Sequence, residues 1–261
     1  MKVDLNGQVA LVTGAAEGIG KAVADLLSAN GAHAVYADIN YEMASSSAAR
    51  SQSGTALEMD VSNESQVEAG VAQIIKQHGR LDIVVNNAGI NTLERRVNID
   101  QFSAEEWQRI LNVDLTGLFL VSRAGSRAMI AKKKGRIINI SSVLGVVPAR
   151  SQCAFVAAKG AVVQLTRAMA IELAPEGILV NCVAPGSTLT NGTKFLFYSE
   201  DAIMKERMER LLSHVPMGRP GTPEEIAHAV LYFAAPPSSY TTGQILCVDG
   251  GWSAGGFLRD F

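Results

Sequence analysis

The residues nearest the N-terminus that could do chemistry form a glycine-rich turn suited to binding phosphate. Gly14, Gly18 and Gly20 follow the apolar run Val9–Thr13 and open a helical pattern. Gly14 permits a tight turn, Gly18 allows close backbone approach, and Gly20 permits close packing of helix on strand. Exposed N–H groups and the helix dipole would then attract a pyrophosphate. Such turns often serve packing alone, but this one lies between a strand and a helix, which favours dinucleotide binding.

A carboxylate further along indicates which dinucleotide is bound. Asp38 lies eighteen residues after Gly20, at the end of the second predicted strand, where it can accept hydrogen bonds from both adenosine ribose hydroxyls. The same charge repels a 2′-phosphate, and Glu17 adds a second negative charge. No Arg or Lys occupies positions 15 to 17, and position 39 is Ile39. The predicted cofactor is therefore NAD, although Asp38 could also be a plain turn residue.

A second group of candidate residues lies near the middle of the chain. Phe155 and Lys159 are one helical turn apart, so both side chains should project from one helix face into one cleft. Ser142 stands thirteen residues before Phe155. Lys159 could also be a surface helix charge, and Ser142 a cap at a strand end. Phe155 carries no ionisable group and cannot transfer a proton.

The elements that must position these residues alternate along the chain. Short β-branched runs predict strands at Val9–Thr13, Ala34–Asp38, Thr55–Met59, Ile83–Asn87, Arg136–Ser141, Leu179–Val183 and Gln244–Val248. Helical patterns predict helices at Gly18–Asn30, Glu64–His78, Ala104–Lys132, Phe155–Ala174 and Pro223–Ala234. This alternation predicts an α/β fold, a Rossmann-type doubly wound parallel sheet of about seven strands with helices on both faces. No linker divides the chain, so residues 1–261 are expected to form one domain.

Composition excludes several other classes of protein. The charges are interspersed and sum to −2, so nucleic-acid binding is not expected. Cys153, Cys182 and Cys247 lie far apart and fit free thiols in a reducing compartment, and the four histidines form no metal-ligand cluster. We expect no signal peptide at the start of the sequence, and we expect its apolar runs to be too short and interrupted to span a bilayer. We expect no metal, no membrane association and a cytoplasmic location.

Five motifs in order give the chain a resemblance to a known family. They are the loop from Thr13 to Gly20, Asn86-Asn87-Ala88-Gly89, Asn139-Ile140-Ser141-Ser142, the Phe155–Lys159 segment, and the run from Pro185 to Thr190. Together they resemble the short-chain dehydrogenase/reductase family over nearly the whole chain, through Val248-Asp249-Gly250-Gly251. The resemblance implies an oxidoreductase that passes hydride between nicotinamide and the carbon of a secondary alcohol or ketone.

The same resemblance implies where the cofactor lies. Asp60 and Val61 would border the adenine, Asn87 and Gly89 would line a ribose, and Thr190 would hold the nicotinamide carboxamide. The segment around Asn87 could instead serve to tie the sheet to the glycine loop. The implied cofactor contacts are Gly14, Glu17, Gly18, Ile19, Gly20, Asp38, Ile39, Asp60, Val61, Asn87, Ala88, Gly89, Lys159, Pro185, Gly186 and Thr190.

The family's catalytic residues map onto four positions. In the family a tyrosine at position 155 exchanges a proton with the substrate oxygen, and Lys159 lowers that tyrosine's pKa and binds the nicotinamide ribose. Ser142 would orient the same substrate oxygen. Asn112 would hold a water in the proton relay, or could be a buried polar group of its helix. Phe155 stands where the tyrosine is expected.

Loss of the hydroxyl at position 155 should cost about 10²–10⁴-fold in rate and leave NAD binding intact. Two explanations remain open: a Tyr→Phe substitution that stops turnover, or a non-catalytic NAD-binding pseudoenzyme with a regulatory role. The intact Ser142 and Asn112 favour the first. A third reading, an acyl-thioester reductase of lipid synthesis, is disfavoured because Asp38 opposes NADP.

The substrate pocket should lie among residues after Gly89, after Ser142 and in a lid at about 190–216. Within the lid we expect Tyr198 to contact the substrate. It is a weak candidate to replace the missing tyrosine as proton donor, because loops position such groups loosely. Arg95, Arg96 and Arg150 could bind a carboxylate or phosphate, though each alone could be a solvated charge. The predicted substrate contacts are Ser142, Arg95, Arg150 and Tyr198, and they favour a polyol or a sugar acid.

The end of the chain suggests further subunits. Aromatic residues in the tail Gly251–Phe261 would be costly to expose and are expected to dock on a neighbour. The resemblance implies a homotetramer with the helices Ala104–Lys132 and Phe155–Ala174 in one interface. Arg259 and the terminal carboxylate would then reach towards a neighbour's active site.

Overall fold

A computed structural model describes residues 3–92, 96–190, 193–194 and 201–255. Over these residues seven parallel strands form one sheet in the order β3-β2-β1-β4-β5-β6-β7. This confirms the predicted fold class. The strands are β1 Val9–Thr13, β2 His33–Asp38, β3 Gly54–Glu58, β4 Ile83–Asn86, β5 Gly135–Ile140, β6 Ile178–Pro185 and β7 Ile245–Val248.

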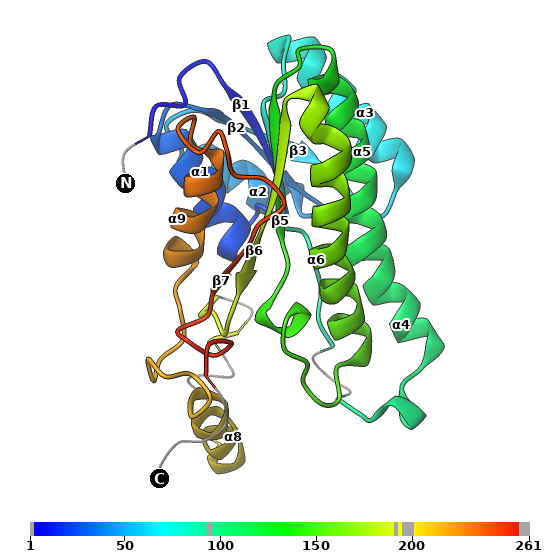
Figure 1. Ribbon diagram of the computed structural model, residues 1–261, viewed down its shortest axis with the longest axis vertical. Helices are drawn as coiled ribbons and strands as arrows, with labels where there is room; N and C mark the ends of the chain where they lie inside the picture. The colour runs from blue at the N-terminus through cyan, green and yellow to red at the C-terminus, as the bar shows by residue number, and fades with distance from the viewer. Residues whose placement is uncertain (1–2, 93–95, 191–192, 195–200, 256–261) are drawn as a thin grey trace.

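Helices cover both faces of the sheet (Figure 1). Helices α1 and α9 pack together on one face, and α3, α5 and α6 lie on the other. Each face is sealed by its own cluster of buried apolar side chains. The helices are α1 Gly18–Ala29, α2 Tyr41–Ala48, α3 Glu64–His78, α4 Ala104–Leu111, α5 Leu118–Ile130, α6 Cys153–Leu173, α8 Ala202–Leu212 and α9 Pro223–Ala234, with short turns η1 Ile99–Gln101, η2 Asn112–Gly117, η3 Val143–Gly145 and η4 Ala174–Glu176.

Two helical predictions differ from the structure. The single helix expected over Ala104–Lys132 is α4 and α5 joined by η2, a wider π-helical turn. Helix α2 was not predicted, because its run of serines has low intrinsic helix propensity. It forms after Asn40, whose side chain accepts a hydrogen bond from the Met43 N–H and so caps the first turn.

The expectation that every apolar run is too short to span a bilayer was wrong for one segment. The helical segment Cys153–Glu176 has 24 residues and contains an 18-residue stretch with a mean hydropathy of 1.3, so by length and composition alone it could span a membrane. This segment contains α6, which packs against β6 and η3, and it carries the buried cation Lys159. Packing against the sheet accounts for its apolar composition, as for the core helix of any layered α/β fold.

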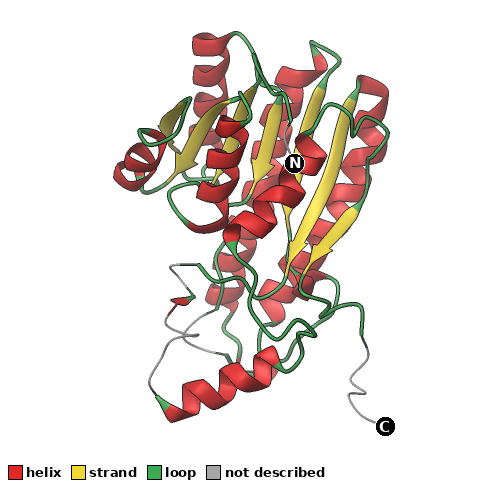
Figure 2. Cartoon of the chain, turned by 90° about the vertical axis from the view of Figure 1, so that its left-hand side faces the viewer, coloured by secondary structure: helices red, strands yellow, loops and turns green. Residues whose placement is uncertain are grey.

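The strand order places the functional motifs at one edge of the sheet. The order reverses between β1 and β4, and ligands of open α/β sheets bind outside the carboxyl ends of the strands at such a point. Figure 2 shows the strand arrowheads at one common edge, with α8 beyond it. The turns that follow β1, β4, β5 and β6 therefore meet at this edge.

A pair of histidines lies elsewhere: His33 is the first residue of β2 and His78 is the last residue of α3. The rings of His33 and His78 lie 4.3 Å apart, and both ring nitrogens of His33 contact hydroxyls, those of Ser53 and Thr55. Burial, and then the charge of His78, lowers the pKa of His33 below its ordinary value. The folded protein therefore binds a proton at His33 less readily than the unfolded chain does.

The first prediction concerns acid stability. Folding lowers the pKa of His33 below its ordinary value of 6.5, so the unfolded chain binds this proton more readily than the folded protein. The free energy of unfolding should therefore fall as the pH drops below 6.5, until it passes the lowered pKa of the folded state. His33→Gln should lose less of its free energy of unfolding between pH 7.5 and 5.5 than the parent, measured by urea denaturation. His228→Gln, at an exposed position of α9, is the control. An equal decline in parent and His33→Gln would contradict the assignment.

Candidate active site

The glycine loop between β1 and α1 has the shape of a cradle. Gly14 and Gly18 have φ values of +63° and +61°, in the left-handed region that glycine favours. A Cβ on Gly20 would lie 2.1 Å from the Gly14 carbonyl oxygen, so only glycine permits this contact. A Cβ on Gly18 would instead point towards Thr190, 3.5 Å from its methyl group. The space between Gly18 and Thr190 is thus kept narrow and free of side chains from the loop.

The first turn of α1 faces this space with its backbone. Glu17 is the N-cap residue, with an extended backbone, and its side chain accepts no capping hydrogen bond. The N–H groups of a first helical turn have no partner within the helix, and they attract anions. The loop therefore fits the pyrophosphate of a dinucleotide, as the sequence predicts.

Asn87 ties the end of β4 to the glycine loop. Its side-chain Nδ2 donates to the carbonyl oxygens of Thr13 and Gly14, both at 3.0 Å. In return the Thr13 hydroxyl oxygen accepts the N–H groups of Asn87 and Ala88, at 3.0 and 3.1 Å. A Cβ on Gly14 would lie 2.9 Å from the Ala88 Cα, so the two segments touch. This amide performs the structural tie that the sequence left open, and its ribose contact stays a prediction.

Asp38 lies beside the glycine loop at the end of β2. Its Oδ2 accepts the Ala16 N–H at 3.0 Å and its Oδ1 accepts the Asn40 N–H at 2.9 Å. A carboxylate has about four acceptor positions, so two remain after these bonds. Ile39 follows it and is 73% exposed. Asp38 can therefore brace the loop and still accept hydrogen bonds from a ribose.

The other predicted cofactor residues lie at the same edge of the sheet. Asp60 follows β3 and accepts the N–H and hydroxyl of Ser62. Val61 is buried, and a Cβ on Gly117 would lie 2.7 Å from one of its methyl groups. Gly186 follows β6 and lies against Asp249, where a Cβ would be 2.7 Å from the Asp249 Cα. The turns after β3 and β6 are thus held by close backbone packing.

Lys159 is buried at the centre of the site. Its Nζ lies 3.3 Å from the Ile140 carbonyl oxygen and 5.6 Å from the centroid of the Phe155 ring. The Ser141 hydroxyl donates to the Lys159 carbonyl oxygen at 2.7 Å and fixes α6 to the end of β5. Lys159 and Phe155 therefore share one helix face, as their spacing predicts. Lys159 is not the surface charge considered as the alternative.

Ser142 follows β5 and begins η3. Its hydroxyl oxygen accepts the Leu144 N–H at 3.1 Å, which is the capping role considered from the sequence. A hydroxyl that accepts one such bond keeps its own proton to donate. The cap and a bond to a substrate oxygen are therefore compatible.

Asn112 lies outside this group of residues, and Asp114 takes the inner position. Asn112 is exposed and accepts a hydrogen bond from Gln108 Nε2 at 2.7 Å. The buried stripe of this region runs through Ile110, Asp114 and Leu118, which recur every four residues, so a residue midway between two of them points outwards. The four-residue spacing of these positions is the sequence signal from which the buried position of Asp114 could have been predicted.

Asp114 forms an ion pair with Lys159. Its Oδ2 lies 3.0 Å from Lys159 Nζ, and the two side chains are 0% and 6% exposed. Its Oδ1 accepts the Ile90 N–H at 2.8 Å. The structure thus brings together Asp114, Lys159 and the segment after β4.

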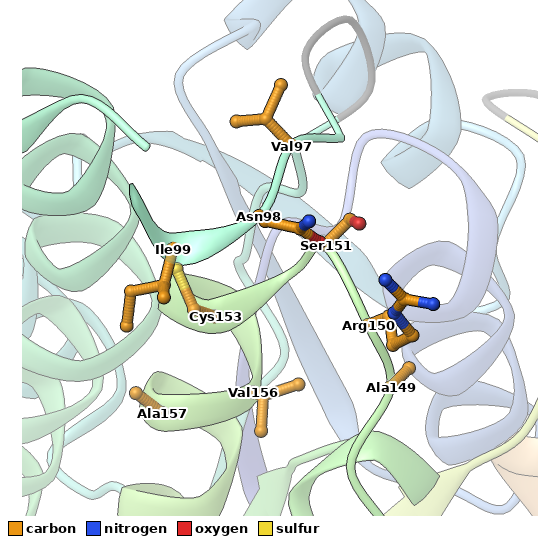
Figure 3. Close-up of a pocket in the computed structure, with 9 residues that line it drawn as sticks. All are labelled: Val97, Asn98, Ile99, Ala149, Arg150, Ser151, Cys153, Val156 and Ala157. Carbon is orange, nitrogen blue, oxygen red and sulfur yellow. The ribbon is translucent and has the colours of Figure 1, made fainter. Parts of the chain in front are cut away.

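Arg150 borders a cavity beside α6 (Figure 3). From α6 the cavity is lined by Cys153, Val156 and Ala157, and Val156 is the neighbour of Phe155 in the chain. The role of Arg150 as a substrate contact stays a prediction. The cavity has a volume of about 460 Å³ and is lined by Val97, Asn98, Ile99, Ala149, Arg150, Ser151, Cys153, Val156 and Ala157.

The remaining substrate predictions fall partly outside the described residues. Arg95 and Tyr198 lie there, as do positions 191–192 and 195–200 of the expected lid. Thr190 is described, and its N–H donates to Thr193 Oγ1 at 2.8 Å. Helix α8 lies beyond the carboxyl ends of the strands, on the side where a lid would stand (Figure 2).

Comparisons with known proteins agree with this arrangement. A family model described as enoyl-(acyl carrier protein) reductase matches residues 14–253. A 3-oxoacyl-[acyl-carrier-protein] reductase of Vibrio cholerae is 40% identical over 255 residues, covering 95% of this chain and 98% of that protein. An NAD-dependent glycerol dehydrogenase of Listeria innocua is 36% identical over 251 residues, covering 96% of this chain and 95% of that protein.

A solved structure extends the similarity to three dimensions. A gluconate 5-dehydrogenase from Burkholderia cenocepacia, in complex with NADP and tartrate, superposes with a TM-score of 0.88 at 35% identity, covering 97% of this chain and 98% of that one. The glycine cradle, the buried lysine and these similarities lead to one conclusion. The chain belongs to the short-chain dehydrogenase/reductase family of oxidoreductases that act on ketones and alcohols.

Proposed function

We propose that the protein is an NAD-dependent oxidoreductase that interconverts a secondary alcohol and a ketone on a polar substrate such as a polyol or sugar acid. The observation that carries this proposal is the buried Lys159, whose ammonium lies where the turns after β4 and β5 meet. Burying a cation is costly, and such a charge at a binding edge is a mark of function. The bound nicotinamide would supply the hydride chemistry. The chain would bind the dinucleotide on Gly14–Gly20 and orient the substrate oxygen with Ser142.

The preference for NAD rests on Asp38. The relatives point both ways, since one is named NAD-dependent and another was solved with NADP. Asp38 keeps two acceptor positions beside the glycine loop, and its negative charge would repel a 2′-phosphate. The partly exposed carboxylate therefore favours the ribose with two free hydroxyls.

The substitution Asp38→Asn should weaken the preference for NAD over NADP. The amide oxygen can still accept the Ala16 N–H, but the charge that opposes a 2′-phosphate is lost. We expect NADP to bind about tenfold or more tightly relative to NAD than in the parent, because a hydrogen bond to a charged group is worth about 1.5–3 kcal/mol. Calorimetric titration with both dinucleotides measures the ratio. Glu105→Gln, which removes an α4 charge, should leave it unchanged, and an unaltered ratio in Asp38→Asn would remove the argument for NAD.

Phe155 should limit the rate of the chain as it stands. Phe155→Tyr should raise alcohol oxidation by about 10²–10⁴-fold, since a positioned proton-transfer group typically contributes that much. NADH formation would be followed with polyols, sugar acids and cyclic alcohols as substrates. Phe155→Leu should show no gain, and Phe155→Tyr combined with Ser142→Ala should lose most of it.

The alternative function is a regulatory NAD-binding pseudoenzyme. Phe155 leaves the site without a proton donor at position 155, although the glycine cradle and Lys159 are in place. If Phe155→Tyr forms no NADH with any substrate of the panel but still binds NAD, the regulatory function is favoured.

A second enzymatic candidate is the reduction of a 3-oxoacyl thioester. The Vibrio cholerae relative carries that name, and its similarity spans nearly the full length of both chains. Asp38 opposes this candidate where the reductant is NADPH. If Phe155→Tyr reduces a 3-oxoacyl thioester but does not oxidise polyols or sugar acids, the thioester reductase function is favoured.

We also propose that residues 1–261 act as one domain in a cytoplasmic homotetramer. Large apolar side chains are exposed on the helices expected at an interface, with Phe119 44% exposed on α5 and Ile171 78% exposed on α6. Exposed apolar patches of this kind favour association. The tail residues 256–261, including Arg259, lie outside the described residues.

Ile171→Glu should lower the mass in solution. A carboxylate at the centre of an apolar interface would remain uncompensated, so we expect dimers or monomers by light scattering. Met217→Glu changes an exposed methionine outside these helices, and it should leave the mass unchanged. A tetramer that persists in Ile171→Glu would place the interface elsewhere.

A further inference from the structure

A buried side chain just before α6 has a polar atom without a partner. Gln152 is 6% exposed, and its Oε1 accepts no hydrogen bond from any described residue. Its side chain does not cap α6 either, although Gln152 is the N-cap residue of that helix. A buried acceptor without a donor destabilises a folded protein, because it has given up its hydrogen bonds to water. A ligand that donates to this oxygen would restore what folding removed.

Gln152 begins the helix face that carries the catalytic positions. It lies three residues before Phe155 and seven before Lys159, and such spacings return to the same face of a helix. Three residues of a helix rise by about 4.5 Å along its axis. Groups at positions 152 and 155 can therefore reach two oxygens on neighbouring carbons of one small molecule.

A second buried polar atom without a partner lies in the segment after β4. Thr92 is 1% exposed, and its Oγ1 bonds to no described residue. Ile90, two residues earlier, packs against a buried cluster that includes Ala154, so this segment and the start of α6 meet in one cluster. The sequence predicts the substrate pocket after Gly89 and after Ser142. Each of these two stretches therefore holds one buried polar atom that a ligand could satisfy.

The chemistry of the Gln152 side chain selects a hydroxyl and not an anion. The cavity beside α6 is lined by Arg150 and by Ser151 and Cys153, the two neighbours of Gln152 in the chain (Figure 3). Gln152 itself lies outside that lining. Its amide is neutral, and it offers an acceptor oxygen together with N–H donors. The group that pairs with both kinds of atom is a hydroxyl, whereas a methyl or methylene group pairs with neither.

We propose that Gln152 is a specificity-determining residue: its amide oxygen accepts a hydrogen bond from a hydroxyl next to the reacting carbon of the substrate. Thr92 offers a second hydrogen-bonding group to the same molecule. The substrate class is then a vicinal diol, which polyols and sugar acids contain, and not a simple secondary alcohol. This inference rests on the proposed function for the place of the reacting carbon at position 155, so its test must separate the two.

Two probes that differ by one hydroxyl test the proposal, propylene glycol and isopropanol. The affinity of each for the NAD complex of the protein is measured by saturation-transfer NMR. An alcohol that cannot donate to Gln152 leaves its oxygen unpaired, so we expect the parent to bind propylene glycol about tenfold more tightly. Gln152→Met keeps the length of the side chain and removes the amide, so its two affinities should agree within about twofold. A parent that binds neither probe or both equally, or a variant that keeps the preference, would overturn the proposal.

The second measurement uses the protein without any ligand. Gln152→Met removes a buried acceptor that has no donor, so the midpoint of thermal unfolding should rise by about 2–4 °C. If the amide instead served the fold, for example through a bound water, the midpoint would fall, and that result would contradict the proposal. Should the methionine not fit, Gln152→Ala adds no bulk, and its affinities for the two probes decide instead.

A matched control separates ligand binding from a general effect of the change. Gln164 is an exposed glutamine of the same helix, and its Oε1 accepts a hydrogen bond from Arg167 at 3.3 Å. Gln164→Met should leave the preference between the probes unchanged, and an equal loss there would overturn the proposal. If Phe155→Tyr oxidises no alcohol while the parent's preference depends on Gln152, only the proposed function is wrong. If Phe155→Tyr oxidises isopropanol as readily as propylene glycol, only the inference about Gln152 is wrong.

Discussion

The structure depends on the close contact between the glycine loop after β1 and the segment after β4. These two central strands are where the strand order reverses, so the helices that follow them leave towards opposite faces of the sheet. The hydrogen bonds from Asn87 to the Thr13 and Gly14 carbonyl oxygens hold the ends of these two strands together where their helices diverge. Gly14 is needed because a Cβ there would press against Ala88. The shape of the glycine loop and the pairing of the central strands thus depend on one set of contacts.

The fold must also hold a buried cation, the Lys159 ammonium, in place. Lys159 lies on α6, and the Ser141 hydroxyl and the Ile140 carbonyl oxygen fix that helix and its ammonium to the end of β5. The carboxylate that balances the charge comes from η2, on the chain between α4 and α5. The site is therefore assembled from three separate stretches of sequence around one charge. Position 155 contributes a phenylalanine ring to this assembly, and that ring carries no ionisable group.

The cavity beside α6 is bordered by two stretches of chain in which the sequence predicts the substrate pocket. Its lining includes Asn98 and Ile99 from the segment after β4, and Arg150 from the segment after Ser142. From α6 it includes Val156, the neighbour of Phe155 in the chain. Arg150 therefore stays a predicted substrate contact.

The sequence by itself determined the fold class, the order of the seven strands along the chain, the glycine loop after β1 and the shared helix face of Phe155 and Lys159. These follow from local rules: alternation of strands and helices, backbone freedom at glycine, and the periods of helix and strand. Only the tertiary structure decided that Asp114, on the chain between α4 and α5, pairs with Lys159 of α6. Such a pairing depends on which helix faces meet and on a π-helical turn, and both are settled by long-range packing.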